Sequence, residues 1–534
     1  MKVKRDSVFL SAPGGRNVFP EALRNILSCL ALCSLILYCT MGSLLTIVGA
    51  AKIIPAHGDL TGAESVNPFV GILAVRTGHL YHPMSSPPYT PQPYGPLFYI
   101  ASAKIAQVAG LDVDVTFRLG RSIVFICLVL CALTAWLLGR QVGFSKGESA
   151  LVAMLLLAQP VLDRWGATMR PDVPMLLMML LALYFALRSQ KTETAFCALS
   201  GLLLGVGFLL KQSAAAGGLA IVLVFLLNKK FKHVVVFVLT AVLPIVIAFA
   251  LLLWHHEPFL EHFFSAGRST WSLSGAASWL AEPHLNRPTA LMLFAVAAAG
   301  TWRAIAEGEQ GQMLVSFAAV NLLAGLASIP QLGGQTNYFI PAFAGCALLL
   351  PFAIRTCQEN IDSIRITGII IILGFLAALA DCVAAYHMLP PSDGGRPIPA
   401  AYFRSLKILS EDDYLLLHTY DPSLIDPFTV HSLELQGRWS AAGVVNDIRA
   451  GKYDLVILGG GYLIPTYRNI ALFGPAIVTA LNEDYEVLCS AGQGIVLKPR
   501  SRDVHVSPET LSHVLRPCVT KSPGPDLMIP YFAQ

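Results

Sequence analysis

Long apolar stretches separated by short polar turns run from residue 27 to about residue 390. An apolar stretch of 18 or more residues predicts a membrane-spanning helix, because about 20 helical residues cross the hydrocarbon core of a bilayer. The pattern therefore predicts about eleven transmembrane helices. The predicted spans are residues 27–49, 119–138, 149–163, 173–188, 195–210, 213–228, 233–254, 288–304, 312–329, 338–354 and 366–386. A shorter apolar helix is expected at residues 95–110, either in the membrane interface or re-entrant.

The pattern changes beyond the last predicted span, where short apolar runs alternate with polar turns. Residues 414–418 and 453–458 are predicted to form strands. Residues 486–488 and 494–497 are predicted to form a closing strand pair. Gly459–Gly461 lacks the GxGxxG spacing of a nucleotide loop and is predicted to be a plain turn. These features indicate a small α/β domain.

The predicted fold is thus an α-helical polytopic membrane protein with a small C-terminal α/β domain on the extracytoplasmic side. The predicted parts are a cytoplasmic segment at 1–26, a transmembrane domain at 27–390 with a large first outer loop at 50–118, the α/β domain at 391–500, and an irregular tail at 501–534.

Composition supports a membrane protein and excludes a soluble one. Hydrophobic residues make up 55% of the 534 residues and charged residues only 13%, whereas a soluble domain carries about 25% charged residues. No Lys- and Arg-rich run with interleaved aromatic residues is present, so nucleic acid is not an expected partner.

Cysteine and histidine spacing gives no sign of a metal site. Most cysteines fall inside apolar runs, where they act as small hydrophobic residues. Cys489 and Cys518 lie in the polar C-terminal region, where a disulfide between them is possible. No CxxC, HxxxH or HExxH spacing occurs, so a divalent metal is possible but unsupported and no cofactor is expected.

The distribution of basic residues predicts the topology. Lys and Arg accumulate in the N-terminal segment and in the loops expected on the same side of the membrane, which is the pattern of cytoplasmic segments. The segments 50–118, 255–287 and 387–534 then lie outside. The basic residues on the predicted cytoplasmic side are Lys2, Lys4, Arg5, Arg16, Arg24, Arg140, Lys146, Arg188, Lys191, Lys229, Lys230, Lys232, Arg303, Arg355 and Arg365.

The outer side also contains the candidate chemistry. The loop after the first span contains His57, Asp59 and Glu64. One of its two carboxylates could act as a general base at the mouth of a membrane cavity, with its pKa set by burial and nearby cations. The alternative is that both are solvated loop acids. The Pro- and Tyr-rich residues 81–99 could line a substrate groove or anchor the loop at the interface.

Further charged residues lie between later spans. Asp163, Arg164, Arg170 and Asp172 separate the third and fourth spans, and Lys211 lies in the short turn between the fifth and sixth. Asp172 has a structural explanation in the positive end of the fourth helix. For Lys211 the structural explanation is a side chain that extends from the edge of the membrane to water.

The topology brings several of these residues together at helix N-termini that point outward. Such ends present free amide groups and a partial positive charge. Arg118 and Arg121 open the second span, Arg170 opens the fourth and Lys211 opens the sixth, while residues 333–338 open the tenth. If these ends cluster, they form an anion site. A membrane-embedded anion with a long apolar tail would be a polyprenyl phosphate.

At these residues the chain resembles a family, the bacterial GT-C type membrane glycosyltransferases of the family-39-like or RgtA/B/C/D-like group. The resemblance covers about residues 50–390 and rests on five motifs in order. They are GHLY at 78–81 with YGPLFY at 94–99, RLGR at 118–121, RPD at 170–172, GVGFLLKQ at 205–212, and GGQTNYF at 333–339.

The resemblance implies a GT-C-like fold and transfer of a sugar from a polyprenyl-phosphate carrier, with inversion, on the outer face of the bacterial plasma membrane. A first-loop acid, Glu64 or Asp59, would be the base, and the acceptor would be a lipid, a glycan or a protein. The residues expected to bind the donor phosphate are Arg170, Lys211 and Arg121. Those expected to line the substrate groove are Tyr81, Tyr94, Asp172, Gln212, Asn337 and Tyr338.

Two departures from the family pattern leave other functions open. Many members have two adjacent acids in the first loop, whereas Asp59 and Glu64 are separated, and many have a Glu shortly after NYF, where this chain has Pro341. The alternatives are a transporter or flippase and a non-catalytic scaffold. A transporter would be expected to contain internal repeats and helices broken at mid-membrane.

Overall fold

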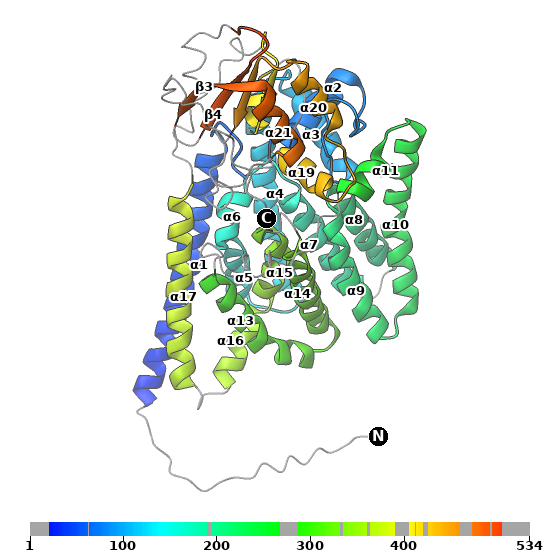
Figure 1. Cartoon of the computed structure of the whole chain (residues 1–534). Helices are drawn as coiled ribbons and strands as arrows, with labels where there is room; N and C mark the ends of the chain where they lie inside the picture. The colour runs from blue at the N-terminus through cyan, green and yellow to red at the C-terminus, as the bar shows by residue number, and fades with distance from the viewer. Residues whose placement is uncertain are drawn as a thin grey trace.

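The computed structural model describes residues 21–61, 64–189, 194–266, 287–331, 335–359, 364–389, 405–411, 413–419, 426–458, 473–491 and 494–504. A bundle of long helices forms the larger part of the structure, and a smaller α/β part covers one end of it (Figure 1).

The bundle confirms a multi-pass membrane protein, and every predicted span overlaps at least one observed helix, while the number of eleven spans stays a prediction. Within the described residues, six helices are long and apolar enough to cross a membrane, and the bent pair α15–α16 gives a seventh. The other bundle helices are shorter. The bundle helices are α1 (Glu21–Ile53), α4 (Val113–Gln141), α5 (Lys146–Leu157), α6 (Pro160–Trp165), α7 (Asp172–Ser189), α8 (Thr194–Leu210), α9 (Ala215–Leu227), α10 (Phe231–Trp254), α13 (Arg287–Ala306), α14 (Glu309–Ser328), α15 (Ile340–Leu348), α16 (Leu350–Glu359) and α17 (Ile364–His387).

The prediction of one span at 149–163 is wrong, because α5 and α6 are separate helices. Pro160 has no amide hydrogen for a helical bond, and it disfavours helical dihedrals in the residue before it. Gln159 accordingly has extended dihedrals, with φ −84° and ψ 119°. The break lets α6 end at Trp165, just before the polar turn that contains Arg170.

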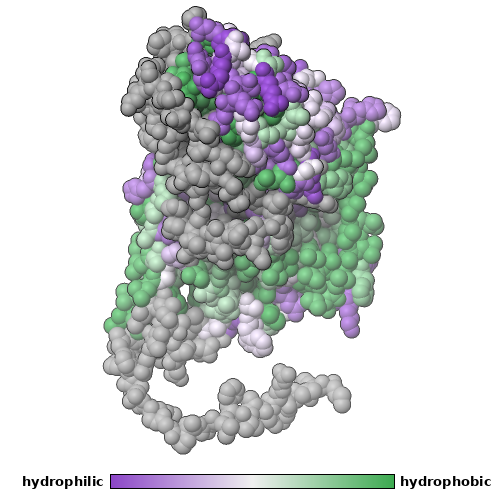
Figure 2. Space-filling view, viewed as in Figure 1, coloured by the Kyte–Doolittle hydropathy of each residue, from purple (hydrophilic) through white to green (hydrophobic). Residues whose placement is uncertain are grey.

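Apolar side chains face outward from the bundle, as expected for a helix surface in contact with lipid. Figure 2 shows a hydrophobic belt around the helices and hydrophilic residues concentrated at the end covered by the α/β part. Inside the bundle, α8 and α10 approach closely at two glycines. A Cβ atom on Gly201 would lie 2.3 Å from the carbonyl oxygen of Phe237, and one on Gly205 would lie 2.2 Å from that of Ala241. Small residues allow this close helix packing within membranes.

Two helices of the first outer loop lie at the same end as the α/β part (Figure 1). They are α2 (Val66–Thr77), which the apolar pattern did not predict, and α3 (Pro96–Val108), which confirms the short helix expected at 95–110. Pro96 occupies the first turn of α3, where its missing amide hydrogen costs nothing. Gly78 ends α2 in the left-handed conformation, with φ 78°. Short turns at this end are η1 (Gln212–Ala214), α11 (Phe259–Glu261), the π-helix η2 (His262–Ala266) and η3 (Thr336–Phe339).

The α/β part contains a four-stranded sheet with the order β1-β2-β4-β3. Its strands are β1 (Ile408–Ser410), β2 (Leu455–Leu458), β3 (Tyr485–Ala491) and β4 (Gly494–Pro499). β1 and β2 are parallel, while β4 is antiparallel to both β2 and β3, so the predicted closing pair is confirmed. Its helices are α18 (Asp413–Leu417), α19 (Pro427–Leu435), α20 (Ala442–Arg449) and α21 (Pro475–Asp484).

The strand predicted at 414–418 is wrong, because these residues belong to α18 and the turn after it. All four residues from Tyr414 to Leu417 are buried, and a short run that is buried on every side has no period that separates helix from strand. The turn predicted at Gly459–Gly461 lies outside the described residues. Cys489 is disulfide-bonded, and Cys518, which the sequence allows as a possible partner, also lies outside the described residues.

Candidate functional site

Glu64, in the predicted first outer loop, and Arg121, in α4, form a fully buried ion pair. Arg121 Nε donates to Glu64 Oε1 at 2.9 Å, and Arg121 Nη2 donates to Oε2 at 2.8 Å. The amides of Met169 and Leu60 donate to the same carboxylate at 2.6 and 3.4 Å. Every oxygen of Glu64 is therefore engaged by donors from the protein.

The remaining donors of Arg121 are also engaged. Its Nη1 and Nη2 groups donate to the backbone carbonyls of Ile53, Ala56 and Gly58, with distances of 3.1 Å to Ile53 and 2.8 Å to Gly58. Gly120 makes room beside it, since a Cβ atom there would lie 2.3 Å from the sulfur of Met169. The RLGR motif thus positions the end of α1, the first loop and the turn before α7.

A second cluster forms around Asp172, the first residue of α7. Lys211 Nζ donates to Asp172 Oδ1 at 2.6 Å, and Asn337 Nδ2 donates to the same oxygen at 2.8 Å. Arg170 Nε lies 3.7 Å from Asp172 Oδ2. Asp172 is therefore more than a helix-end acid, because it joins α7 to the turn after α8 and to η3. We call Arg170, Asp172, Lys211 and Asn337 the cation cluster.

Aromatic rings enclose the cation cluster. The guanidinium of Arg170 lies 4.5 Å from the ring centre of Trp165, and Lys211 Nζ lies 4.7 Å from that of Tyr338. Arg170 Nη2 also donates to the hydroxyl of Tyr94. The neighbouring Gln212 holds the Tyr94 segment in place through a 2.9 Å bond to the carbonyl of Pro93.

The four residues of the cation cluster have one excess positive charge, which the nearby Asp59 partly balances, and some of their polar atoms have no hydrogen bond. Arg170, Asp172 and Lys211 are all buried, and together they carry two positive charges and one negative charge. Among the described residues, Arg170 Nε, Asp172 Oδ2 and Asn337 Oδ1 have no hydrogen-bond partner. Because an uncompensated buried charge is costly, the arrangement favours an anionic ligand.

Asp59 lies beside the cation cluster and is partly exposed. Its two oxygens accept from the amides of Thr61 and Ser65, both at 2.8 Å. The hydroxyl of Thr61 in turn accepts from Arg170 Nη1 at 3.4 Å. Arg164 donates to the carbonyl of Leu60 and fixes the loop from its other side.

The α/β part also contributes an acid near this site. Asp426 is buried at the start of α19 and accepts from the amide and hydroxyl of Thr429. Burial raises the pKa of its carboxyl, and the bonds from Thr429 and the charge of Arg170 oppose that effect, while the charge of Asp59 adds to it. The carboxyl therefore lies within electrostatic range of both Arg170 and Asp59.

Tyr81 has a structural position away from the cation cluster. Its amide donates to Glu257 Oε2 at 2.8 Å, and its hydroxyl donates to the carbonyl of Tyr94 at 3.3 Å. His262 stabilises the same loop, because its Nδ1 accepts from the amide of Gln92 at 3.1 Å and its Nε2 donates to the carbonyl of His82 at 2.6 Å. Burial lowers the pKa of His262 to about 4, so the ring is neutral.

The structure thus brings most of the sequence-predicted residues into one region. Arg170, Lys211, Asp172, Asn337 and Tyr338 meet directly, with Tyr94, Gln212 and Asp59 adjoining them, whereas Tyr81, Glu64 and Arg121 hold the surrounding loops. The residues that sequence reasoning did not select are Thr61, Trp165 and Asp426. Within the described parts of the chain, no group of three His, Cys, Asp or Glu side chains is placed to hold a metal ion.

The chain is similar to known glycosyltransferases in both sequence and fold. Residues 103–254 match the family model described as dolichyl-phosphate-mannose-protein mannosyltransferase. No curated protein sequence matches the chain significantly.

Several solved structures are similar to this chain in fold. ArnT from Cupriavidus metallidurans bound to undecaprenyl phosphate has 13% identity and a TM-score of 0.55, covering 86% of this chain and 97% of ArnT. Its apo state gives a TM-score of 0.54 with the same identity and coverage. The oligosaccharyltransferase AglB from Archaeoglobus fulgidus has 12% identity and a TM-score of 0.46, covering 85% of this chain and 72% of AglB. The similarity to ArnT confirms a GT-C-like fold.

Proposed function

We propose that this protein is a glycosyltransferase that moves a sugar from a polyprenyl-phosphate carrier to an acceptor hydroxyl, with inversion at the anomeric carbon. The observation that supports this proposal best is the cation cluster, a buried site with excess positive charge beside a partly exposed carboxylate. ArnT has a similar fold and is known with undecaprenyl phosphate bound, and the matched family is described by a dolichyl-phosphate sugar donor.

Arg170 and Lys211 bind the donor phosphate in this proposal. An ammonium group has three donors, and Lys211 directs one to Asp172. Arg170 Nε has no hydrogen-bond partner among the described residues. Lys211 can therefore donate to a phosphate oxygen while it keeps its bond to Asp172, and Arg170 Nε can do so at the expense of only a 3.7 Å ion-pair contact with Asp172 Oδ2. Asp172 and Asn337 orient them.

Asp59 is the general base in this proposal. The oxygens of both first-loop acids accept two backbone amides, but those of Glu64 also accept two bonds from the buried guanidinium of Arg121, and this makes Glu64 unsuited to the role. A base also needs access to the acceptor, and Glu64 is fully buried whereas Asp59 is partly exposed. The choice between the two first-loop acids thus favours Asp59.

Arg121 acts as a positioning residue and does not bind phosphate in this scheme. Its guanidinium donates to Glu64 and to three backbone carbonyls, and its side chain is fully buried. Binding a phosphate would require it to release several of these bonds. Its function is to hold the loop in which Asp59 lies.

The reaction then proceeds as one displacement. Asp59 takes the proton of the acceptor hydroxyl, and the acceptor oxygen forms a bond to the anomeric carbon as the bond from that carbon to the phosphate oxygen breaks. The bonding electrons remain on the polyprenyl phosphate, whose growing charge is stabilised by Arg170 and Lys211. The leaving phosphate already carries charge, so these two cations suffice and the proposal includes no metal.

We place the reaction on the outer face of a bacterial plasma membrane, with the N-terminus in the cytoplasm. The basic N-terminal segment and basic loops support this orientation. The site lies at the end of the bundle that the α/β part covers (Figure 1), so this part would be extracytoplasmic. The acceptor is a lipid, a glycan or a protein of the cell envelope.

The test uses the purified full-length protein in lipid nanodiscs with undecaprenyl-phosphate-linked sugars extracted from the source cells. A glycosyltransferase consumes the donor and produces free undecaprenyl phosphate and a glycosylated acceptor in equal amounts, detected by mass spectrometry. A transporter leaves the donor intact in nanodiscs but moves it across the membrane when the protein is reconstituted in sealed vesicles, and a scaffold binds the donor without turnover. Either of these results would contradict the proposal.

A further inference from the structure

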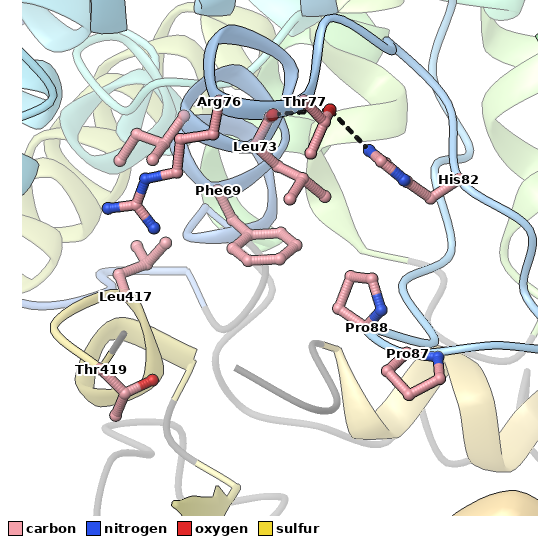
Figure 3. A pocket seen from close by; sticks show the side chains of 10 residues that line it. Phe69, Leu73, Arg76, Thr77, His82, Pro87, Pro88, Leu417 and Thr419 are labelled. Atoms are coloured by element: carbon pink, nitrogen blue, oxygen red, sulfur yellow. Dashed lines mark hydrogen bonds between the residues drawn. The ribbon is translucent and has the colours of Figure 1, made fainter. Parts of the chain in front are cut away.

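A separate cavity lies between α2, the loop that follows it and the α/β part. Its volume is about 520 Å³, within the range of about 300–1,000 Å³ that is typical of small-molecule sites. In Figure 3 the lining residue Phe69 lies between Arg76 and Thr77, at the end of α2, and Pro87 and Pro88 on the opposite side. None of its lining residues belongs to the cation cluster.

One side of the cavity is cationic and polar. Arg76 is exposed, and its guanidinium has no hydrogen bond or ion pair with any described residue. In Figure 3 this guanidinium points from α2 toward Leu417, across the cavity. His82 lies 3.3 Å from the hydroxyl of Thr77, and burial lowers the pKa of its imidazole, so at neutral pH the ring is an uncharged hydrogen-bonding group.

Most of the remaining lining is apolar, with Thr419 as the polar exception. Phe69, Pro88 and Leu417 are buried, and they present ring faces and methyl groups to the cavity. This combination fits a sugar, since the C–H face of a sugar ring packs on aromatic and proline rings while its hydroxyl groups need hydrogen-bond partners. An unpaired Arg at the rim selects a sugar that carries a phosphate or a carboxylate.

The cavity is also connected to the loop that contains Asp59. Leu417 belongs to α18, and the hydroxyl of Tyr414 in the same helix donates to Asp114 and lies 3.4 Å from His57 Nδ1. His57 in turn lies 3.1 Å from Asp114 Oδ1 and precedes Asp59 by two positions. A ligand that packs on Leu417 therefore contacts α18, and α18 in turn contacts the loop that contains Asp59.

We propose that this cavity binds an anionic sugar unit of the acceptor, with Arg76 contacting its phosphate or carboxylate and Phe69 contacting its ring. The assignment to the acceptor rests on the proposed glycosyltransferase function, whereas the binding of an anionic sugar does not. The bound unit anchors the acceptor against α18, whose Tyr414 contacts the loop that contains Asp59.

The test is a calorimetric titration of the full-length protein in detergent with N-acetylglucosamine 1-phosphate, without any donor. The wild-type protein should bind this sugar phosphate at least about tenfold more tightly than it binds N-acetylglucosamine or inorganic phosphate, because only the sugar phosphate uses both sides of the cavity. Arg76→Gln should remove that preference. Arg438→Gln, which neutralises an exposed arginine of the α/β part, is the matched control and should bind as the wild type does.

A second variant, Leu73→Trp, adds volume at the cavity wall and should weaken binding even though Arg76 is retained. Titration with lipid A in the same detergent identifies the source of the ligand. Tighter binding of lipid A than of the soluble sugar phosphate supports a membrane glycolipid, and weaker binding supports a soluble glycan.

Equal affinity of the wild type and Arg76→Gln for the sugar phosphate would overturn the inference, as would equal affinity for inorganic phosphate and the sugar phosphate. A measurement of sugar transfer shows whether the acceptor site or the proposed glycosyltransferase function is wrong. A protein that transfers sugar normally with Arg76→Gln contradicts only the acceptor site, and one that binds the sugar phosphate but consumes no donor contradicts only the proposed function.

Discussion

Arg121 and Glu64 pair through two hydrogen bonds of 2.9 and 2.8 Å, with neither side chain exposed to solvent. A carboxylate held in this way stabilises a loop and is poorly suited to accept a proton from a substrate. The sequence leaves open which of the two acids, Glu64 or Asp59, is the base. The buried pair favours Glu64 as the residue that positions the loop and Asp59 as the candidate base.

Glu64→Gln should destabilise the protein strongly. The change leaves the guanidinium of Arg121 buried without its counter-charge, which costs about 3–5 kcal/mol. The free energy of unfolding, measured by denaturant titration in mixed micelles, should fall by that amount. Glu261→Gln, at an exposed position, should change it little. A Glu64→Gln protein of wild-type stability would show that the buried pair is not structural.

Lys211→Met should weaken the binding of undecaprenyl phosphate by about tenfold or more, because one charge-assisted hydrogen bond contributes about 1.5–3 kcal/mol. Affinity can be measured by tryptophan fluorescence or by calorimetry in detergent. Lys211→Arg should retain part of the affinity, and Lys104→Met, at an exposed position of α3, should retain all of it. Unchanged affinity in Lys211→Met would remove Lys211 from the donor site.

The neutral His262 should make stability depend on pH. Burial lowers its pKa to about 4 in the folded protein, while an unfolded histidine has a pKa of about 6.5. As the pH falls, His262 takes up a proton in the unfolded state before it does so in the folded state. The contribution of neutral His262 to the free energy of unfolding is therefore fully present above pH 6.5 and is lost as the pH falls toward 4. The loss is about 3 kcal/mol on this basis.

Unfolding titrations at several pH values test this dependence with matched variants. His262→Gln should flatten the dependence between pH 6.5 and 4, whereas His255→Gln, at an exposed position, should preserve it. A wild-type protein whose stability does not fall over this range would contradict the neutral, doubly bonded state of His262.

Tyr414→Phe should loosen the contact between the α/β part and the first outer loop. The change removes the hydroxyl that donates to Asp114 and lies near His57. Hydrogen exchange of the amides near Asp59 should accelerate, by about fivefold for a lost bond that contributes about 1 kcal/mol. Unchanged exchange would indicate that α18 does not stabilise the loop.

Much of the fold follows from local pattern, because membrane spans and their helices depend on runs of apolar residues within a single segment. The errors have equally local causes. Pro160 divides a predicted span in two, and α18 is buried on all sides, which removes the periodicity that separates helix from strand.

The candidate site could be predicted only in part. The topology placed Arg170 and Lys211 at outward helix ends, and the structure brings both to Asp172. The pairing of Glu64 with Arg121 depends on contacts between residues 57 positions apart, which no local pattern encodes. For the same reason the proximity of Asp426 to Arg170 could not be inferred from sequence.

The most direct test of the account is the turnover of undecaprenyl-phosphate-linked sugar by the Asp59→Asn variant in nanodiscs, compared with the wild type at equal amounts of folded protein. Loss of the general base should lower the rate of sugar transfer by about 10²–10⁴-fold, while the affinity for undecaprenyl phosphate and the free energy of unfolding stay close to the wild-type values. Wild-type turnover by Asp59→Asn would contradict the account.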